Sequence, residues 1–266
     1  MTPLLYIEGP AFWAPTLPGW DAARAAFRGE GALADPPAKR PAPQVLPPAE
    51  RRRAPDTVAL ALEVAAASVA AAGRQATELP CVFASAHGDL AINDYMSSTL
   101  VSAPTQLSPT KFHNSVHNAA VGYWTIGTGC MEASNSLAAY EYSFAAALLE
   151  AAAQCAADQR PVLLVGFDVA AIGALASVTT SRGLLAAALV LAPERTQRSV
   201  ASMAWSLASG PSAPAALRSE AAGTLTANAM ADALPVFEAL ARATPVEDLR
   251  LPLGPNLSLQ LRLSQS

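Results

Sequence analysis

The chain has 266 residues, of which 52% are hydrophobic and only 14% are charged, with a net charge of −4. This acidic balance argues against nucleic-acid binding, because such proteins carry a basic surface. The scarcity of charge indicates either a large apolar surface that a partner subunit covers or an alanine-rich chain that is merely poor in charge, and we favour the partner.

The cysteine count and the start of the chain bear on its location. Cys81, Cys130 and Cys155 are few and odd in number, which is typical of a reducing compartment and provides no disulfide framework. The first ten residues lack the basic and apolar regions of a secretory signal. The longest apolar run, residues 58–72, contains Glu63 and is too short to cross a bilayer. We therefore expect a cytoplasmic protein without a membrane span.

The first hundred residues predict short strands that alternate with helices, interrupted by one arm rich in proline. The expected elements are a strand at 4–7, a helix at 21–28, an extended surface arm at 35–55, a helix at 56–73 capped by Asp56, a buried strand at 79–84 and a helix at 92–100.

The alternation continues through the rest of the chain. The expected elements are a helix at 118–128, a strand at 134–139, a helix at 141–157, a buried strand at 161–167, two adjacent strands at 184–191 and 201–207, a helix at 228–242 and an edge strand at 257–263. Strands that alternate with helices and then pair with each other predict an α/β fold with a mixed sheet flanked by helices.

The chain has three histidines, which are candidates for metal ligands or for catalytic bases. His113 and His117 are four residues apart, so a helix would present them together. No third ligand lies close in the sequence, and we expect hydrogen-bonded loop histidines instead, with His87 in the loop SAHGD equally structural. The usual nucleotide, zinc and serine-hydrolase motifs do not occur. We expect no metal and no cofactor.

The most informative stretch is the corner Tyr140-Glu141-Tyr142-Ser143, between a predicted strand and a predicted helix. A side chain in the first turn of a helix lies near unpaired backbone N–H groups and the positive end of the helix dipole. That position activates a thiol, whereas the carboxylate of Glu141 is a poor acyl carrier. The plain alternative is that Glu141 is an ordinary acidic residue in the first turn of a helix.

Residues 108–154, followed by RPVLLVGFDV, resemble the N-terminal half of a β-ketoacyl synthase of the thiolase superfamily. Asn118, Gly122 and Thr125 match the family's NxxAGxxT helix, with one residue inserted. The strand at 134–139 and Ser143 match the approach to the nucleophile and the serine that follows it. Glu141 then occupies the position of the catalytic cysteine.

This resemblance implies a single truncated ketosynthase-like domain over residues 1–266, with a thiolase-like half-fold. The cysteine is replaced, and the HGT- and GH-type motifs that carry the two catalytic histidines are not present. Such relatives look like the chain-length-factor-type subunits of aryl polyene and xanthomonadin pigment biosynthesis. The resemblance therefore implies a non-catalytic subunit in a heterodimer with a full-length β-ketoacyl synthase. The pairing strand would be Ser134, Asn135, Ser136, Leu137, Ala138 and Ala139.

Three functions remain open from the sequence. In the first, the chain completes a ketosynthase, and the aromatic residues near Glu141 either form a pocket gate or are simply core. In the second, it is a stand-alone acyl-thioester hydrolase or decarboxylase with Glu141 as base beside a histidine. In the third, it is a homodimer that binds acyl carrier protein through Arg51–Arg53 or Arg182. The candidate pocket or gate residues are Tyr140, Glu141, Tyr142, Phe144, His113 and His117.

Overall fold

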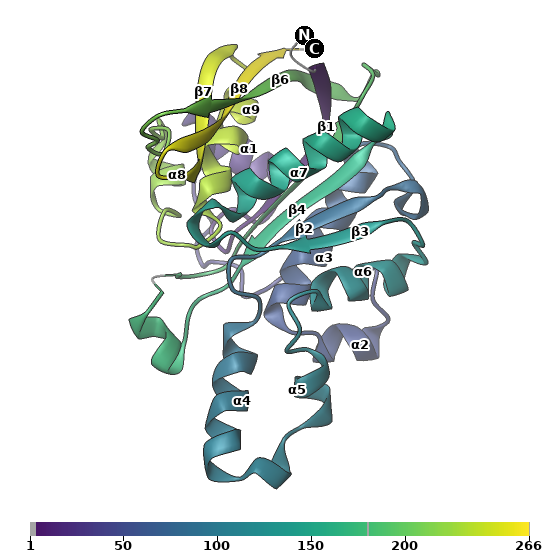
Figure 1. Cartoon of the computed structure of the whole chain (residues 1–266), viewed down its shortest axis with the longest axis vertical. Helices are drawn as coiled ribbons and strands as arrows, with labels where there is room; N and C mark the ends of the chain where they lie inside the picture. Colours follow the sequence, from purple (N-terminus) through teal and green to yellow (C-terminus); the bar gives the residue numbers. More distant parts are fainter. Residues whose placement is uncertain (1–3, 180, 266) are drawn as a thin grey trace.

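A computed structural model describes residues 4–179 and 181–265. Its centre is a mixed eight-stranded sheet in the order β3-β2-β4-β5-β1-β6-β8-β7 (Figure 1). The strands β3, β2 and β4 are parallel, and every other neighbouring pair is antiparallel. The strands are β1 Leu4–Trp13, β2 Cys81–Ala84, β3 Ser134–Leu137, β4 Val162–Asp168, β5 Leu185–Ala192, β6 Ser199–Ser209, β7 Val246–Gly254 and β8 Leu257–Gln265.

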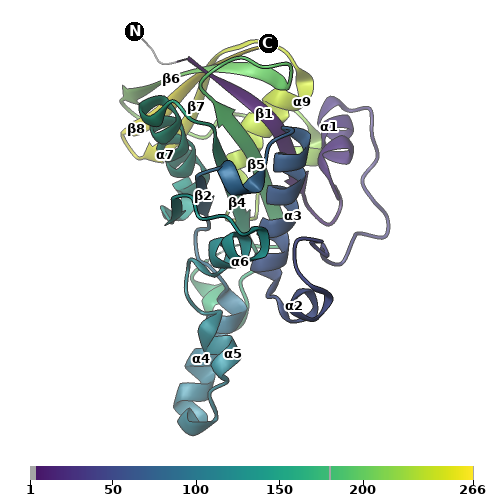
Figure 2. The ribbon, with the colours of Figure 1, turned by 90° about the vertical axis from the view of Figure 1, so that its right-hand side faces the viewer.

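Helices cover both faces of this sheet, so the predicted α/β class is confirmed. One face packs against α3 (Asp56–Ala71) and α6 (Ala119–Thr128). The opposite face packs against α7 (Ser143–Asp158), α1 (Trp20–Arg28) and α9 (Leu234–Arg242). Figure 2 shows α3 and α7 on the two sides of the central strands. Each face has its own hydrophobic core.

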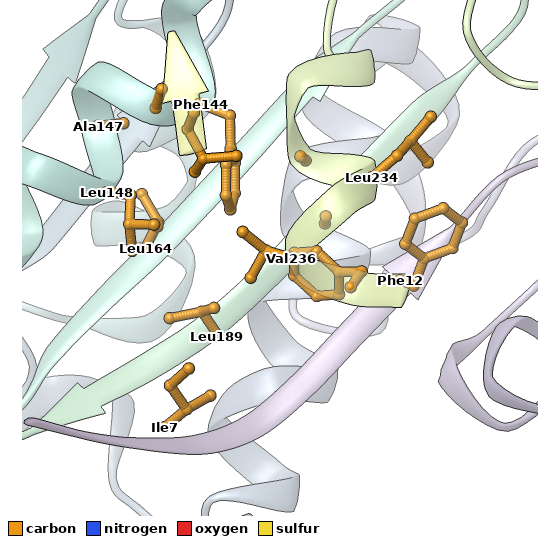
Figure 3. Packing of buried hydrophobic residues seen from close by; sticks show 14 of the residues in the cluster. Ile7, Phe12, Phe144, Ala147, Leu148, Leu164, Leu189, Leu234 and Val236 are labelled. Carbon is orange, nitrogen blue, oxygen red and sulfur yellow. The ribbon is translucent and has the colours of Figure 1, made fainter. Parts of the chain in front are cut away.

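The central strands β4 and β5 are buried on both faces, as their continuous apolar runs predict. Phe144 on α7 lies in the core beneath them, with its ring centroid 5.9 Å from that of Phe237 on α9. Figure 3 shows Phe144 together with Leu148, Leu164 and Val236. This core joins the helix after the corner to the C-terminal part of the chain.

A glycine in β4 permits this close packing. A Cβ atom on Gly166 would lie 2.8 Å from Sδ of Met230 and 2.9 Å from Cδ2 of Phe144. Those separations are too short for real carbon contacts, so only glycine lets both side chains meet the strand. Residues 214–235, called the C-terminal segment below, thereby pack directly on the central sheet through Met230.

Two helices project from the body below the sheet (Figure 1). They are α4 (Leu90–Ser102) and α5 (Pro109–His113). Asp89 caps α4, because its carboxylate accepts hydrogen bonds from the Ile92 N–H at 2.8 Å and the Thr57 hydroxyl at 2.9 Å. The projection is therefore fixed at its base on α3.

The predicted strand order was wrong at two places. The strand at 257–263 is not at an edge, because β8 lies between β6 and β7, and β7 forms the edge. The strands β5 and β6 are not adjacent either, because β1 lies between them and pairs with both. Alternation of apolar residues reveals that a strand exists but not which neighbour it pairs with. The strand β7 was missed because Glu247, Asp248, Arg250 and Pro252 interrupt its apolar pattern.

Four local predictions also need correction. Residues 48–53 of the predicted extended arm form the short helix α2 (Pro48–Arg53), and Leu46 is buried against α6. Asp56 does not cap α3; it forms an ion pair with Arg40 at 3.2 Å. The predicted helix at 228–242 is α-helical only from Leu234 to Arg242, and the short helix α8 (Glu220–Gly223) precedes it. The predicted strand at 134–139 ends at Leu137.

Across the described residues, no helix combines the length and the apolar character that a membrane crossing requires.

Candidate functional site

The corner before α7 has a strained backbone. Residues Tyr140–Tyr142 form a 3-10 turn, and Tyr140 has a φ of +52°, a left-handed conformation that residues other than glycine adopt only rarely. Buried Ser143 holds this turn: its hydroxyl donates to the Tyr140 carbonyl at 2.7 Å and accepts from the Ala139 N–H at 3.0 Å. Ser143 therefore fixes the abrupt change of direction between strand and helix.

The N-terminus of α7 is closed by an acidic side chain from the C-terminal segment. The Asp232 carboxylate accepts hydrogen bonds from the backbone N–H groups of Phe144 at 2.8 Å and Ala145 at 3.1 Å. Burial raises the pKa of Asp232 to about 7, although these two hydrogen bonds act in the opposite direction. Its other oxygen, Oδ1, is buried and has no partner among the described residues.

Glu141 does not act as the helix cap that its sequence position suggested. Within the described part of the chain, its carboxylate makes no hydrogen bond or ion pair, because Asp232 takes the first free amides of α7. The Glu141 side chain is exposed and lines a cavity. Its carboxylate is therefore free to meet another molecule.

This cavity has a volume of about 550 Å³ and lies between the corner and the C-terminal segment. Tyr140, Glu141 and Tyr142, which are candidate pocket or gate residues from the sequence, form one wall. The opposite wall consists mostly of small and apolar side chains from residues 214–235, with Leu251 and Pro252 of β7. The corner thus faces a part of the chain for which the sequence predicted no role.

His87, which the sequence predicted to be a structural loop residue, also lines the cavity. Its ring packs edge-on against Tyr140, with centroids 5.5 Å apart, and its Nε2 lies 2.9 Å from the Thr179 hydroxyl. Burial lowers the pKa of His87 below its usual value, so the ring is neutral near pH 7. The available signal was its position after β2, since parallel strands bring their C-terminal ends together.

The loop that carries His87 is anchored on the end of β4. Asp168 is buried there and accepts hydrogen bonds from the Ser85 hydroxyl at 2.7 Å and the Ala86 N–H at 2.8 Å. Burial raises the pKa of Asp168 to about 7. No local pattern in the sequence marks Asp168 as part of the site, because its partners Ser85 and Ala86 lie 83 and 82 positions earlier in the chain.

The structure does not bring the other predicted pocket residues to the cavity. The Nε2–H of His117 donates to the Ser85 carbonyl at 2.8 Å, and its Nδ1 lies 3.1 Å from the Ser136 hydroxyl. His113 is exposed beside the ring of Tyr123. Phe144 is fully buried in the core (Figure 3). None of the three lines the cavity, so Glu141 is not paired with either predicted histidine.

The cysteines of the chain offer no nucleophile in this cavity. Cys81, Cys130 and Cys155 are all buried, and none of them lines it. Burial raises the pKa of the Cys81 thiol and of the Cys155 thiol to about 12 in each case. Such thiols remain protonated near pH 7 and are unreactive.

The chain has the same fold as several solved structures. The chain is 22% identical, with a TM-score of 0.74, to a chain of the ketosynthase ApeO in complex with its chain length factor ApeC from Xenorhabdus doucetiae, over 98% of this chain and 99% of that one. It is 15% identical, with a TM-score of 0.72, to a chain of the ishigamide ketosynthase/chain length factor, over 100% and 99%. A β-ketoacyl synthase from Burkholderia phymatum STM815 is 15% identical, with a TM-score of 0.59, over 91% and 71%.

No curated protein matches the chain. A protein-family model described as "Beta-ketoacyl synthase, N-terminal domain" matches residues 24–249. This range includes the corner, most of the cavity wall and six of the eight strands, β2 to β7, the last of them in part. The predicted resemblance to the N-terminal half of a ketosynthase is confirmed, and the chain belongs to the family of β-ketoacyl synthase N-terminal domains.

Proposed function

We propose that the chain is a non-catalytic, chain-length-factor-like subunit that pairs with a full-length β-ketoacyl synthase and serves acyl groups held on acyl carrier protein. The main support for this proposal is that a glutamate, and not a cysteine, lies at the corner before α7. Glu141 occupies the position that the resemblance to ketosynthases assigns to the catalytic cysteine. Asp232 already accepts hydrogen bonds from the free backbone N–H groups at the start of α7. A thiolate would need that helix end for its activation.

The open edge of the sheet supports pairing with another subunit. β3 is the terminal strand next to β2, and its residues are largely exposed. An exposed edge strand offers unpaired backbone N–H and C=O groups to a second strand. We propose that Ser134–Leu137 pair with the ketosynthase across a two-fold axis, with Ala138 and Ala139 in the following turn.

Exposed apolar side chains concentrate in the part of the sequence that leads up to β3 and the corner. Of the fourteen large hydrophobic side chains exposed among the described residues, seven lie between residues 100 and 140. Water-exposed apolar side chains in such numbers favour burial against a partner. The seven are Leu100, Val101, Phe112, Val116, Ile126, Met131 and Tyr140.

We further propose roles for the residues around the cavity. We also propose that the protein is cytoplasmic. Tyr140, Glu141 and Tyr142 would gate the space at the corner, whereas the buried Phe144 would act only by holding α7 in place. Arg52, Arg53 and Arg182 are exposed and available to an acidic carrier protein. The three buried, unpaired cysteines are consistent with a reducing compartment.

Co-expression with a full-length ketosynthase from the same source tests the pairing. With an affinity tag on the ketosynthase alone, the chain should copurify in a one-to-one complex. A stable homodimer of the chain that hydrolyses acyl thioesters without the ketosynthase would overturn the proposal and support the stand-alone enzyme.

The variant Glu141→Ala tests whether the corner takes part in chemistry. Assembly and condensation by the complex should both remain nearly intact, because the Glu141 carboxylate makes no hydrogen bond or ion pair among the described residues and, as a gate, would affect the length of the products and not the condensation step. Ser143→Ala is the matched comparison, since it removes the two hydrogen bonds that fix the turn and should weaken the fold. Loss of condensation with assembly preserved in Glu141→Ala would show that the subunit has a catalytic role.

A further inference from the structure

The cavity beside the corner has the properties of a small-molecule site. Its volume of about 550 Å³ is within the range of roughly 300–1,000 Å³ that is usual for such sites. Alanine, proline and leucine side chains form most of the wall that the C-terminal segment supplies. The proposed pairing does not say which molecule occupies this space, so a ligand here goes beyond it.

The charges around the cavity exclude one large class of ligands. Among its described lining residues, the ionisable groups are His87, Glu141, Asp232 and two tyrosines, with neither lysine nor arginine. A fatty carboxylate or a phosphate would therefore lose its water without meeting a cation and would meet the Glu141 carboxylate instead. An uncharged ligand incurs neither cost.

Most polar groups deeper in the wall are already occupied. The Asn228 amide donates to the Arg182 carbonyl at 3.0 Å, and the Ser181 hydroxyl donates to the Val169 carbonyl at 2.7 Å. Asp232 accepts from the start of α7 through Oδ2, whereas its buried Oδ1 has no partner among the described residues. The wall therefore offers an apolar surface over most of its area, since a buried polar group that is already paired gains little from a ligand.

Three free polar groups lie together at the corner. The hydroxyls of Tyr140 and Tyr142 and the carboxylate of Glu141 have no hydrogen-bond partner within the described ranges 4–179 and 181–265. Glu141 accepts hydrogen bonds, and a tyrosine hydroxyl both donates and accepts. A ligand with an apolar body and a polar end that can donate a hydrogen bond would match this distribution.

We propose that this cavity binds an uncharged amphiphile: a hydrocarbon chain whose polar end is an alcohol or an amide, placed at Glu141. The hydrocarbon body lies against the wall formed by residues 214–235. No bond is made or broken, so the site selects and holds the molecule. The binding is a property of this chain and does not depend on which subunit it pairs with.

Two probes of equal chain length separate charge from size. 1-Octanol and octanoate are titrated into the purified chain, or into its complex with the ketosynthase, by calorimetry at about pH 8, where octanoate is an anion. 1-Octanol should bind saturably with a Kd below about 1 mM, and octanoate should bind at least ~10-fold more weakly. The proposal would be wrong if octanoate bound as tightly as 1-octanol, or if 1-octanol did not bind.

Matched variants locate the binding. Ala227 is exposed at the cavity, so Ala227→Trp should reduce 1-octanol affinity at least ~10-fold without disturbing the core. Ala213 is exposed in the same segment but does not line the cavity, and Ala213→Trp should leave the affinity unchanged. Glu141→Gln should narrow the difference between the two probes. Equal effects of the two tryptophan variants would contradict the location.

A third measurement does not depend on any variant folding. A photoreactive octanol that carries a diazirine should label the wild-type chain on peptides containing residues 140–142 or 226–232. Excess 1-octanol should suppress the labelling. Labelling confined to other peptides would show that the alcohol binds elsewhere and would remove the cavity as its site.

Discussion

The carboxylate of Asp232 accepts a hydrogen bond of 2.8 Å from the backbone N–H of Phe144, a residue 88 positions earlier in the chain. This contact places a hydrogen-bond acceptor at the start of α7, directly beside the corner. It also ties the C-terminal segment to the helix that in the family follows the nucleophile. The corner and the wall of its cavity are therefore one structural unit.

The first prediction concerns the stability that this contact provides. Asp232→Ala leaves the N–H groups of Phe144 and Ala145 without a partner and should lower the free energy of unfolding by about 1–3 kcal/mol in urea titrations. Asp158→Ala is the control, because Asp158 is exposed at the other end of α7, and its effect should stay within about 0.5 kcal/mol. Equal losses in both variants would argue against a special role for the cap.

The second prediction concerns pH. Burial raises the pKa of Asp232 and of Asp168 to about 7, above the ordinary value of 3.8. Between about pH 4 and pH 7 the folded protein holds protons on these carboxyls that the unfolded chain has released. The free energy of unfolding should therefore decrease as the pH rises through this window, by at most about 1.4 kcal/mol per pH unit for each carboxyl.

The variant Asp232→Asn isolates one of these groups. Because the amide does not titrate, the curve of unfolding free energy against pH should be flatter than that of the wild type between about pH 5 and pH 7. Urea titrations at several pH values provide the measurement. Parallel curves for the two proteins would mean that Asp232 keeps an ordinary pKa in the fold.

The third prediction concerns the packing of the C-terminal segment on the sheet. In Gly166→Ala the new Cβ would lie 2.8 Å from Sδ of Met230, and the variant should lose about 1–3 kcal/mol of unfolding free energy. The same change at Gly122 in α6 meets nothing within 4 Å and should be neutral or stabilise the helix by up to about 1 kcal/mol. A neutral Gly166→Ala would show that Met230 moves aside freely.

The fourth prediction concerns the apolar side chains that we assign to the partner interface. Ile126 and Met131 are 84% and 95% exposed, so Ile126→Glu and Met131→Glu should leave the unfolding free energy of the isolated chain within about 0.5 kcal/mol. Their affinity for the ketosynthase should fall at least ~10-fold, measured by calorimetry or by copurification. Leu207→Glu, on β6 in the other half of the sheet, should keep full affinity. A loss equal to that of Ile126→Glu would place the interface elsewhere.

The sequence predicted the elements that have strong local patterns. The double-sided burial of β4 followed from its unbroken apolar run, and the helix ending near Gly73 followed from alanine content and from a glycine that adopts a φ of +63°. Resemblance to the ketosynthase family came from local motifs around Glu141 and located the corner correctly. These features depend on neighbours within a few residues, so the sequence alone contains them.

The tertiary structure decided the pairing of strands and the contents of the site. Nothing local indicates that β1 lies between β5 and β6, or that Asp232 and not Glu141 caps α7. His87 reaches the cavity and His117 does not, because the first faces Tyr140 while the second is held by Ser85. Each of these outcomes depends on groups brought together from distant parts of the chain, and packing and hydrogen bonding in the folded state select among arrangements that the sequence pattern leaves equivalent.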